Sequence, residues 1–321
     1  YDYLILGCGS QHSYFGHNEW ENFAPGLKTL SQATEIRRRV LLAFEQAAGE
    51  TSIQKRNQHL TFVIIGGGPT GVELAGAIGE MSRYTLTKDF KKLDTSRTRI
   101  ILVEGMPRIL MPYDEALSKK AARDLENLGV QVWTNALVTK IDESGVFIGD
   151  ERINASTVLW AAGVSPASLT ASLPFAKDKM GRVLTESNCS VKGYPNIFVA
   201  GDQAAFKDGE RYLPGLAPVA IQQGRYIGEY LIYKERGKEY KPFRYLDKGQ
   251  MATIGRKRAV LQAFGFKLSG WLAWYAWLFV HIYYLVGFKN RVSVILQWLW
   301  SYMNFRRGAR LIVDKEWKFY Q

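Results

Sequence analysis

The glycine-rich run GGGPTGVELAG, residues 66–76, constrains the fold of this chain more than any other stretch. It follows Leu60 to Ile65, a β-branched run that predicts a short buried strand, and it opens a predicted helix. In the pattern Gly66-x-Gly68-x-x-Gly71 the first glycine allows a tight turn, the second lets the backbone approach a pyrophosphate, and the third lets helix and strand pack closely. The helix N-terminus favours the negative charge of the phosphates. A structural turn is the alternative, but the strand before the run and the helix after it favour a dinucleotide site.

The next predicted strand ends at an acidic residue. Arg99 to Val103 reads as a strand, and Glu104 follows it where a carboxylate can accept hydrogen bonds from an adenosine ribose 2′-OH. Because a carboxylate there repels a 2′-phosphate, the sequence predicts a preference for NADH over NADPH. Glu104 lies further from Gly71 than the usual spacing of about 20 residues, and the polar stretch 83–97 accounts for the excess. Arg108 is the competing signal, since it could pair with a 2′-phosphate, although an exposed salt-bridging arginine is the simpler interpretation.

Glu73 has two interpretations. It lies in the first turn of the predicted helix, where the helix dipole favours a carboxylate. Alternatively, it lies close to a redox centre and relays protons. The small residues Ala75 and Gly76 extend the close-packing face of the same helix.

Strands and helices alternate along the chain, which predicts an α/β, Rossmann-like architecture. Apolar spacing predicts a helix over 31–48 with Ser31 as its N-cap, and the polar stretch 49–58 reads as a connection. A second helix over 118–128 ends at Gly129, a good C-terminal cap. Further predicted elements are strands at 130–133, 157–161 and 197–200, a hairpin at 138–148 and a helix at 219–233.

Composition limits the possible partners. The 321 residues are 47% hydrophobic, which predicts two domains with buried cores, and they carry a formal charge of +12. That charge favours an anionic membrane surface, because no RNP-like, zinc-finger or helix-turn-helix pattern indicates nucleic acid. The two cysteines, Cys8 and Cys189, form no CxxC or metal-ligand cluster, so the sequence predicts no metal site.

The C-terminal tail is rich in aromatic residues. Trp271 to Phe288 contains no Lys, Arg, Asp or Glu, and at about 1.5 Å per residue it spans about 27 Å, marginal against a hydrocarbon core of about 30 Å. A second run, 292–305, is shorter. The tail therefore predicts helices that lie on a membrane surface rather than cross it, with a buried core helix as the alternative. His281 reads as an interfacial packing residue, and the flanking cations are Lys267, Lys289, Arg291, Arg306, Arg307 and Arg310.

The chain resembles a known family, the type II NADH:quinone oxidoreductases, which are single-chain flavoenzymes of respiratory membranes. The matching stretches run in family order: YDYLILGCG, PGLKTLSQATEIRRRVLLAFE, FVIIGGGPTGVELAG, VLWAAGV, IFVAGD, LPGLAPVAIQQG, YLDKGQMATIGR and the aromatic tail. The resemblance implies a two-dinucleotide-binding-domain flavoprotein that transfers hydride from NADH to FAD and electrons on to a membrane quinone. It also implies a C-terminal membrane-associating helical region. The implied domains are a partial FAD domain at 1–56 and 165–235, an NADH domain at 57–164, and a membrane-anchoring region at 236–321.

The resemblance also assigns roles to individual residues. Gly201 and Asp202 match the Gly-Asp pair whose carboxylate holds the ribityl or phosphate region of FAD. Gly163 lies in the glycine corner of VLWAAGV and contacts cofactor. Ala217 opens the segment beside the flavin and the quinone, although Pro218 stands where the family often has glutamine.

Three further residues match the quinone side of the family's site. Gln222 is expected to contact the quinone carbonyl, with Gln223 as the second candidate, and solvated helix glutamines are the alternative. Lys248 matches a lysine on the side of the flavin where it is re-oxidised, where a cation stabilises developing negative charge. An ordinary surface lysine is the competing interpretation.

The start of the chain departs from the family. Tyr1 to Gly9 corresponds to a strand late in the first half of the FAD domain, with Gly7-Cys8-Gly9 in place of the usual Ala-Thr-Gly. The resemblance implies about 100 preceding residues, including the first FAD-binding glycine motif. A soluble pyridine-nucleotide flavoprotein reductase with another acceptor, and a non-catalytic fragment that binds NADH or membrane without FAD, remain alternatives. The family further implies a peripheral protein on the cytoplasmic face of a bacterial plasma membrane, and a possible homodimer.

Overall fold

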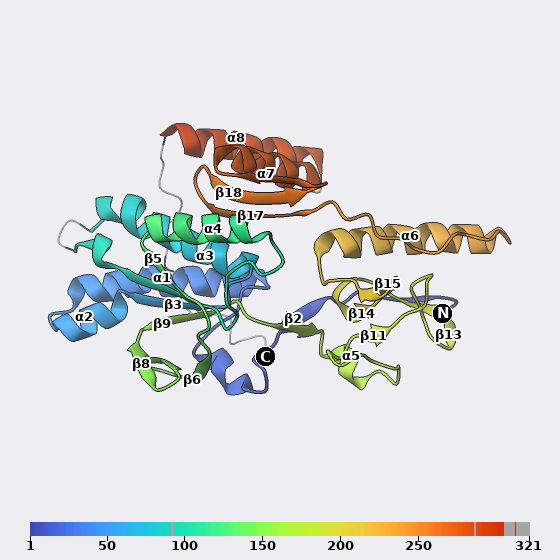
Figure 1. Cartoon of the computed structure of the whole chain (residues 1–321), viewed down its shortest axis with the longest axis horizontal. Helices are drawn as coiled ribbons and strands as arrows, with labels where there is room; N and C mark the ends of the chain where they lie inside the picture. Colours follow the sequence, from blue (N-terminus) through green and yellow to red (C-terminus); the bar gives the residue numbers. More distant parts are fainter. Residues whose placement is uncertain (91–92, 286, 305–311, 313–321) are drawn as a thin grey trace. The chain divides into compact units, whose positions relative to one another are not determined.

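The computed structural model describes residues 1–90, 93–285, 287–304 and 312 (Figure 1). Its residues group into two compact units, one of 1–15 and 163–248 and the other of 16–162 and 249–321. Residues 16–56, expected in the FAD domain, are grouped with the second unit. The reason is that helix α1 (Leu30–Gly49) stacks Phe44 on Phe62 of that unit's sheet.

A four-stranded parallel sheet forms the centre of the second unit, in the order β5-β4-β3-β9. The middle strands are buried along nearly their whole length, as expected for a parallel sheet covered on both faces. Chain order reverses between β3 and β9, which is the kind of switch point where open α/β sheets bind ligands. The predicted strands are confirmed as β3 (Thr61–Ile65), β4 (Arg99–Val103), β5 (Val130–Trp133) and β9 (Thr157–Trp160).

The helices of this unit correct two sequence expectations. Helix α1 is capped by Thr29, whose side chain accepts a hydrogen bond from the backbone N–H of Gln32 in a capping box, so the prediction of Ser31 as N-cap is wrong. The predicted connection at 49–58 contains helix α2 (Ile53–His59), which has no buried residue and therefore no apolar periodicity to reveal it. Helix α3 (Pro69–Glu80) follows the glycine turn, and α4 (Glu115–Asn127) starts where Asp114 caps it.

The predicted excursion after α3 consists of tight helical turns in its described part. A π-helical turn at Met81–Thr85 is followed by 3₁₀ turns at Leu86–Lys88 and Thr95–Arg97. The predicted hairpin is confirmed as the antiparallel pair β6 (Val138–Asp142) and β7 (Gly145–Ile148), and β8 (Glu151–Asn154) adds a third strand.

A second antiparallel sheet covers α3. Strands β17 (Gln250–Gly255), β18 (Arg258–Ala263) and β19 (Phe266–Ser269) form a meander, and helices α7 (Trp271–Tyr284) and α8 (Phe288–Asn304) lie on its outer side (Figure 1). Gly76 permits the contact between α3 and β17, because a Cβ at this position would lie 1.8 Å from the carbonyl oxygen of Ile254. Close packing at Gly76 is therefore confirmed, but its partner is β17, whereas Gly71 packs on the glycine turn after β3.

The first unit is built on the parallel pair β1 (Leu4–Leu6) and β13 (Tyr194–Val199), with β12 (Ser190–Val191) antiparallel at the edge. Helix α6 (Ala217–Glu235) contains the predicted helix and begins two residues earlier. The remaining elements of this unit are short: β2 (Ser10–His12), β10 (Val164–Pro166), α5 (Leu169–Ser172), β11 (Val183–Leu184), a 3₁₀ turn at Gly201–Gln203, β14 (Ala204–Ala205), β15 (Lys207–Asp208) and β16 (Arg211–Tyr212).

Helices α7 and α8 expose large apolar side chains. Within the described part of the chain, no helix is both long and apolar enough to cross a bilayer. His281 packs its ring 4.1 Å from that of Trp277 and bonds through Nδ1 to the carbonyl oxygen of the same residue. The predicted flanking cations Arg306, Arg307 and Arg310 lie outside the described residues.

Candidate nucleotide and flavin sites

The three motif glycines differ in what surrounds them. Gly66 has a φ of 110°, and a Cβ on it would lie 2.7 Å from the backbone of Ala161 at the end of β9. A Cβ on Gly71 would lie 1.8 Å from the carbonyl oxygen of Gly66, so α3 packs directly on the turn. Gly68 has no heavy atom within 4 Å of an added Cβ. The turn is therefore open at Gly68, where a pyrophosphate would approach the first N–H groups of α3.

The carboxylate of Glu104 is fixed beside this open turn. Its Oε2 accepts a hydrogen bond of 2.6 Å from the backbone N–H of Gly67, and its Oε1 accepts one of 2.8 Å from Met106. Glu104 stays the candidate for binding the ribose hydroxyls, and these two hydrogen bonds fix its orientation. The guanidinium of Arg108, the competing signal for a 2′-phosphate, donates to the carbonyl oxygens of Tyr113 and Met111, each at 2.8 Å.

Glu73 points from α3 towards β17. Its Oε1 accepts a 3.2 Å hydrogen bond from the backbone N–H of Thr253. Burial raises the pKa of Glu73, and the hydrogen bond from Thr253 opposes this rise. Burial also raises the pKa of Tyr113, with a smaller contribution from the charge of Glu73. Glu73 therefore holds a proton to higher pH than an exposed glutamate would.

Two glycine corners meet at one edge of the parallel pair in the first unit. Leu6 of β1 lies opposite Val199 of β13, so the corner 7–9 and the turn 201–203 follow at the same carboxyl edge. Ser10 donates to the carboxylate of Asp202, and the backbone N–H of Cys8 donates to Gln203. A carboxyl edge of parallel strands with glycine corners is where a dinucleotide cofactor binds, so these residues fit FAD.

The predicted quinone-side glutamines both hold backbone groups. The amide of Gln222 forms two hydrogen bonds with the backbone of Leu246, of 3.0 Å and 2.9 Å. Gln223 is 1% exposed and accepts a 2.7 Å bond from the N–H of Gly201. Gln223 thus fixes the Gly-Asp turn against α6, which begins at the exposed Ala217.

Gly163 and Lys248 are the first and last residues of the segment 163–248 of the first unit. A Cβ on Gly163 would lie 2.6 Å from Cζ of Phe15 and 2.9 Å from the carbonyl oxygen of Ser13, so this glycine allows close packing. Lys248 is exposed and is the last residue of the unit.

One residue that the sequence did not single out, Gln203, links the corner 7–9 to helix α5. Gln203 is fully buried, and its amide also donates to Thr170, at 2.6 Å. A glutamine directly after a Gly-Asp pair was the available signal, because a buried amide needs partners on both sides.

Comparisons with known proteins match both parts of the chain. Residues 1–224 match the pyridine nucleotide-disulphide oxidoreductase family, and residues 248–307 match the NDH2 C-terminal domain. Among curated relatives, the type II NADH:quinone oxidoreductase NdhA of Mycobacterium tuberculosis is 41% identical over 98% of this chain and 69% of the relative. Its counterpart Ndh from the same organism is 38% identical over 98% of this chain and 70% of the relative. This chain belongs to the type II NADH:quinone oxidoreductase family.

Solved structures agree on the fold of this type II NADH:quinone oxidoreductase. NDH2 from Plasmodium falciparum, in complex with NADH, superposes with a TM-score of 0.88 at 18% identity and covers 98% of this chain and 79% of that one. The NAD-dependent persulfide reductase from A. fulgidus has a TM-score of 0.60 over 82% of this chain and 44% of that one, at 19% identity. The predicted two-dinucleotide-binding fold is confirmed.

Proposed function

We propose that this protein is a FAD-dependent NADH:quinone oxidoreductase attached to a membrane surface. The observation that carries the proposal is the carboxylate of Glu104, held beside an open glycine turn at the N-terminus of α3. Family membership supplies the reaction class, since the curated relatives are NADH:quinone oxidoreductases.

Each candidate residue has a task that its surroundings support. The N–H groups at the start of α3 hold the NADH pyrophosphate, and Glu104 accepts from the ribose hydroxyls. Gly201 and Asp202, with the corner 7–9, hold FAD at the carboxyl edge of β1 and β13. FAD, when bound, supplies a two-electron carrier between NADH and the quinone.

Two polar side chains of the first unit, Gln222 and Lys248, are the candidates for the quinone side. Gln222 has a second amide N–H beyond the one that it donates to Leu246, and that N–H donates to a quinone carbonyl oxygen. The ammonium of Lys248 stabilises negative charge that develops as the quinone is reduced. In the second unit, Glu73 has a separate role: its pKa is raised by burial, and it holds a proton for transfer.

Membrane attachment is the second part of the proposal. The outward faces of α7 and α8 expose Trp271, Phe279 and Phe288, at 57%, 72% and 81%, and the cations Lys289 and Arg291 lie in the first turn of α8. Aromatic side chains beside cations suit the interface of an anionic bilayer. A homodimer on the cytoplasmic face of a bacterial plasma membrane completes the proposed setting.

Electron transfer from NADH to a soluble short-chain quinone tests the function. The chain is supplied with FAD and anionic vesicles, and quinone-dependent NADH oxidation is expected. Glu104→Gln should lower kcat/KM for NADH about tenfold, through KM, because ribose binding is lost while the chemical step is not. The control is Glu115→Gln on α4, an exposed glutamate paired with Lys119, which should leave kcat/KM unchanged. No quinone reduction in the presence of FAD, or an unchanged KM in Glu104→Gln, would contradict the proposal.

A further inference from the structure

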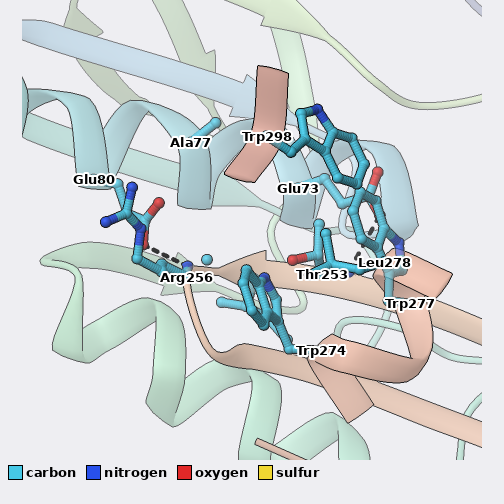
Figure 2. Close-up of a pocket in the computed structure, with 11 residues that line it drawn as sticks. Glu73, Ala77, Glu80, Thr253, Arg256, Trp274, Trp277, Leu278 and Trp298 are labelled. Carbon is cyan, nitrogen blue, oxygen red and sulfur yellow. Dashed lines mark hydrogen bonds between the residues drawn. The ribbon is translucent and has the colours of Figure 1, made fainter. Parts of the chain in front are cut away.

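A pocket in the second unit lies between α3, the tip of β17 and the two C-terminal helices (Figure 2). Its volume is about 360 Å³, and it lies along α3 beyond the glycine turn. Three tryptophans, two glutamates and one arginine account for its aromatic and charged lining: Trp274, Trp277, Trp298, Glu73, Glu80 and Arg256. The three tryptophans have no part in the nucleotide site proposed at the glycine turn.

The two ends of the pocket differ in charge. At one end Glu80 and Arg256 lie together, and the carboxylate accepts a 2.5 Å hydrogen bond from the backbone N–H of Arg256 (Figure 2). At the other end Glu73 lies among the indoles. The influences on the pKa of Glu73 are burial and the backbone hydrogen bond from Thr253, and no cationic side chain of the described residues is among them. In its ionised form Glu73 makes this end of the pocket electronegative, and in the described part of the chain the carboxylate has no side-chain counter-ion. A cation beside Glu73 would favour this ionised form.

The tryptophans supply the second element of recognition. The rings of Trp277 and Trp298 stack at 6.2 Å with an interplanar angle of 10°, and Trp274 is 5% exposed. Indole faces are the strongest aromatic partners for cations, and ammonium ligands are recognised in this way. A carboxylate beside indole faces suits an ammonium group better than an uncharged ring.

The aromatic end of the pocket also contains a hydrogen-bond donor without an acceptor. The indole Nε1 of Trp277 is buried and has no hydrogen-bond partner among the described residues. Because a buried N–H without an acceptor is unfavourable, a ligand oxygen that accepts from it would stabilise the complex. An ammonium joined by a short linker to a phosphate ester offers both groups at once.

We propose that this pocket binds an ammonium group attached to a phosphate ester, the chemistry of ethanolamine phosphate and choline phosphate. The ammonium lies against Glu73 and the indoles, and a phosphate oxygen accepts from Trp277 Nε1. The source is either a phospholipid headgroup or a soluble phosphoamine. The lipid source rests on the proposed membrane attachment, whereas the site itself does not.

Titration calorimetry on the full chain with phosphoethanolamine and phosphocholine tests the site. Binding to the wild-type chain is expected, with an affinity about tenfold lower in Glu73→Gln and in Trp298→Leu. Glu73→Gln keeps an acceptor for the N–H of Thr253. The matched control is Trp300→Leu, a 55% exposed tryptophan of the same helix that does not line the pocket, and its affinity should be unchanged. Circular dichroism establishes that each variant is folded.

Vesicle flotation separates the two sources. If the ligand is lipid, adding phosphatidylethanolamine to phosphatidylglycerol vesicles should increase binding of the wild-type chain and of Trp300→Leu, but not of Trp298→Leu. A response to the soluble phosphoamine without that increase would support a soluble ligand in the same pocket. Failure to bind pure phosphatidylglycerol vesicles would contradict membrane attachment alone. The pocket proposal is overturned if neither phosphoamine binds, if all variants bind equally, or if an uncharged quinone occupies the pocket independently of Glu73.

Discussion

At the scale of single residues, the glycine turn uses one residue type in two ways. The same residue type performs opposite tasks at Gly68 and Gly71, one leaving space for a ligand and the other removing a clash. Glycine conservation within a motif would not distinguish these tasks, because both would appear as an invariant glycine. The geometry around an added Cβ does distinguish them.

Alanine substitutions at these two glycines should therefore fail in different ways. Gly71→Ala places a Cβ 1.8 Å from the carbonyl oxygen of Gly66, so the free energy of unfolding should fall by about 1–3 kcal/mol or more. In Gly68→Ala the new Cβ meets nothing within 4 Å, so this variant should lose less stability than Gly71→Ala, with only the N-cap of α3 affected, while NADH binding weakens. Urea denaturation and NADH titration measure the two effects. An equal loss of stability in both variants would show that the turn is not packed as described.

At the scale of one element, α1 shows why helix starts are hard to predict. Thr29 and Ser31 are both good capping residues two positions apart, and apolar periodicity does not choose between them. The reciprocal hydrogen bonds between Thr29 and Gln32 select the earlier position. Helix α2 was missed for a related reason, because it buries nothing and leaves no periodic signal.

Removing the two hydroxyl groups in turn tests this cap. Thr29→Ala should lower the free energy of unfolding by about 1 kcal/mol, because a helix N–H loses its acceptor. Ser31→Ala should change it by a few tenths at most, since an exposed residue inside the first turn loses no cap. Thermal unfolding of the two variants side by side measures the difference, and a larger effect at Ser31 would restore the original assignment.

For the whole molecule, the strongest expectation concerns the surface formed by α7 and α8. The excess of cations in the sequence and the exposed aromatic side chains favour the same anionic partner. Attraction between exposed charges weakens as salt shortens the screening length, whereas burial of aromatic rings in lipid does not depend on salt in this way.

Binding to anionic vesicles should therefore fall as ionic strength rises, without disappearing. Phe279→Ser should weaken binding further at every salt concentration. Ile53→Ser on α2 is the matched control, because both side chains are 72% exposed and Ile53 lies away from the C-terminal helices in sequence. Co-sedimentation with phosphatidylglycerol vesicles measures both, and an equal effect of the two substitutions would argue against a specific surface.

Local signals predicted most of the fold and long-range contacts account for the rest. The strands at 61–65 and 99–103 and the roles of Gly66 and Gly71 follow from short patterns, so the sequence is sufficient for them. The partner of Gln222 is Leu246, far along the chain, and the pocket around Glu73 requires residues from α3 to α8. A local sequence pattern does not predict contacts between residues so far apart in the chain.

The second unit is formed by two separate segments of the chain, and this limits how its nucleotide-binding part can be transferred to another protein. The chain leaves this unit after residue 162 and returns at residue 249. The returning strands bring Ala252, Ile254 and Val260 into the same buried cluster as β3 and β4. A chimaera that transplants 16–162 alone would carry Gly76 without the strand that this glycine accommodates. The portable module is therefore discontinuous, and a functional graft must include the meander at 250–269.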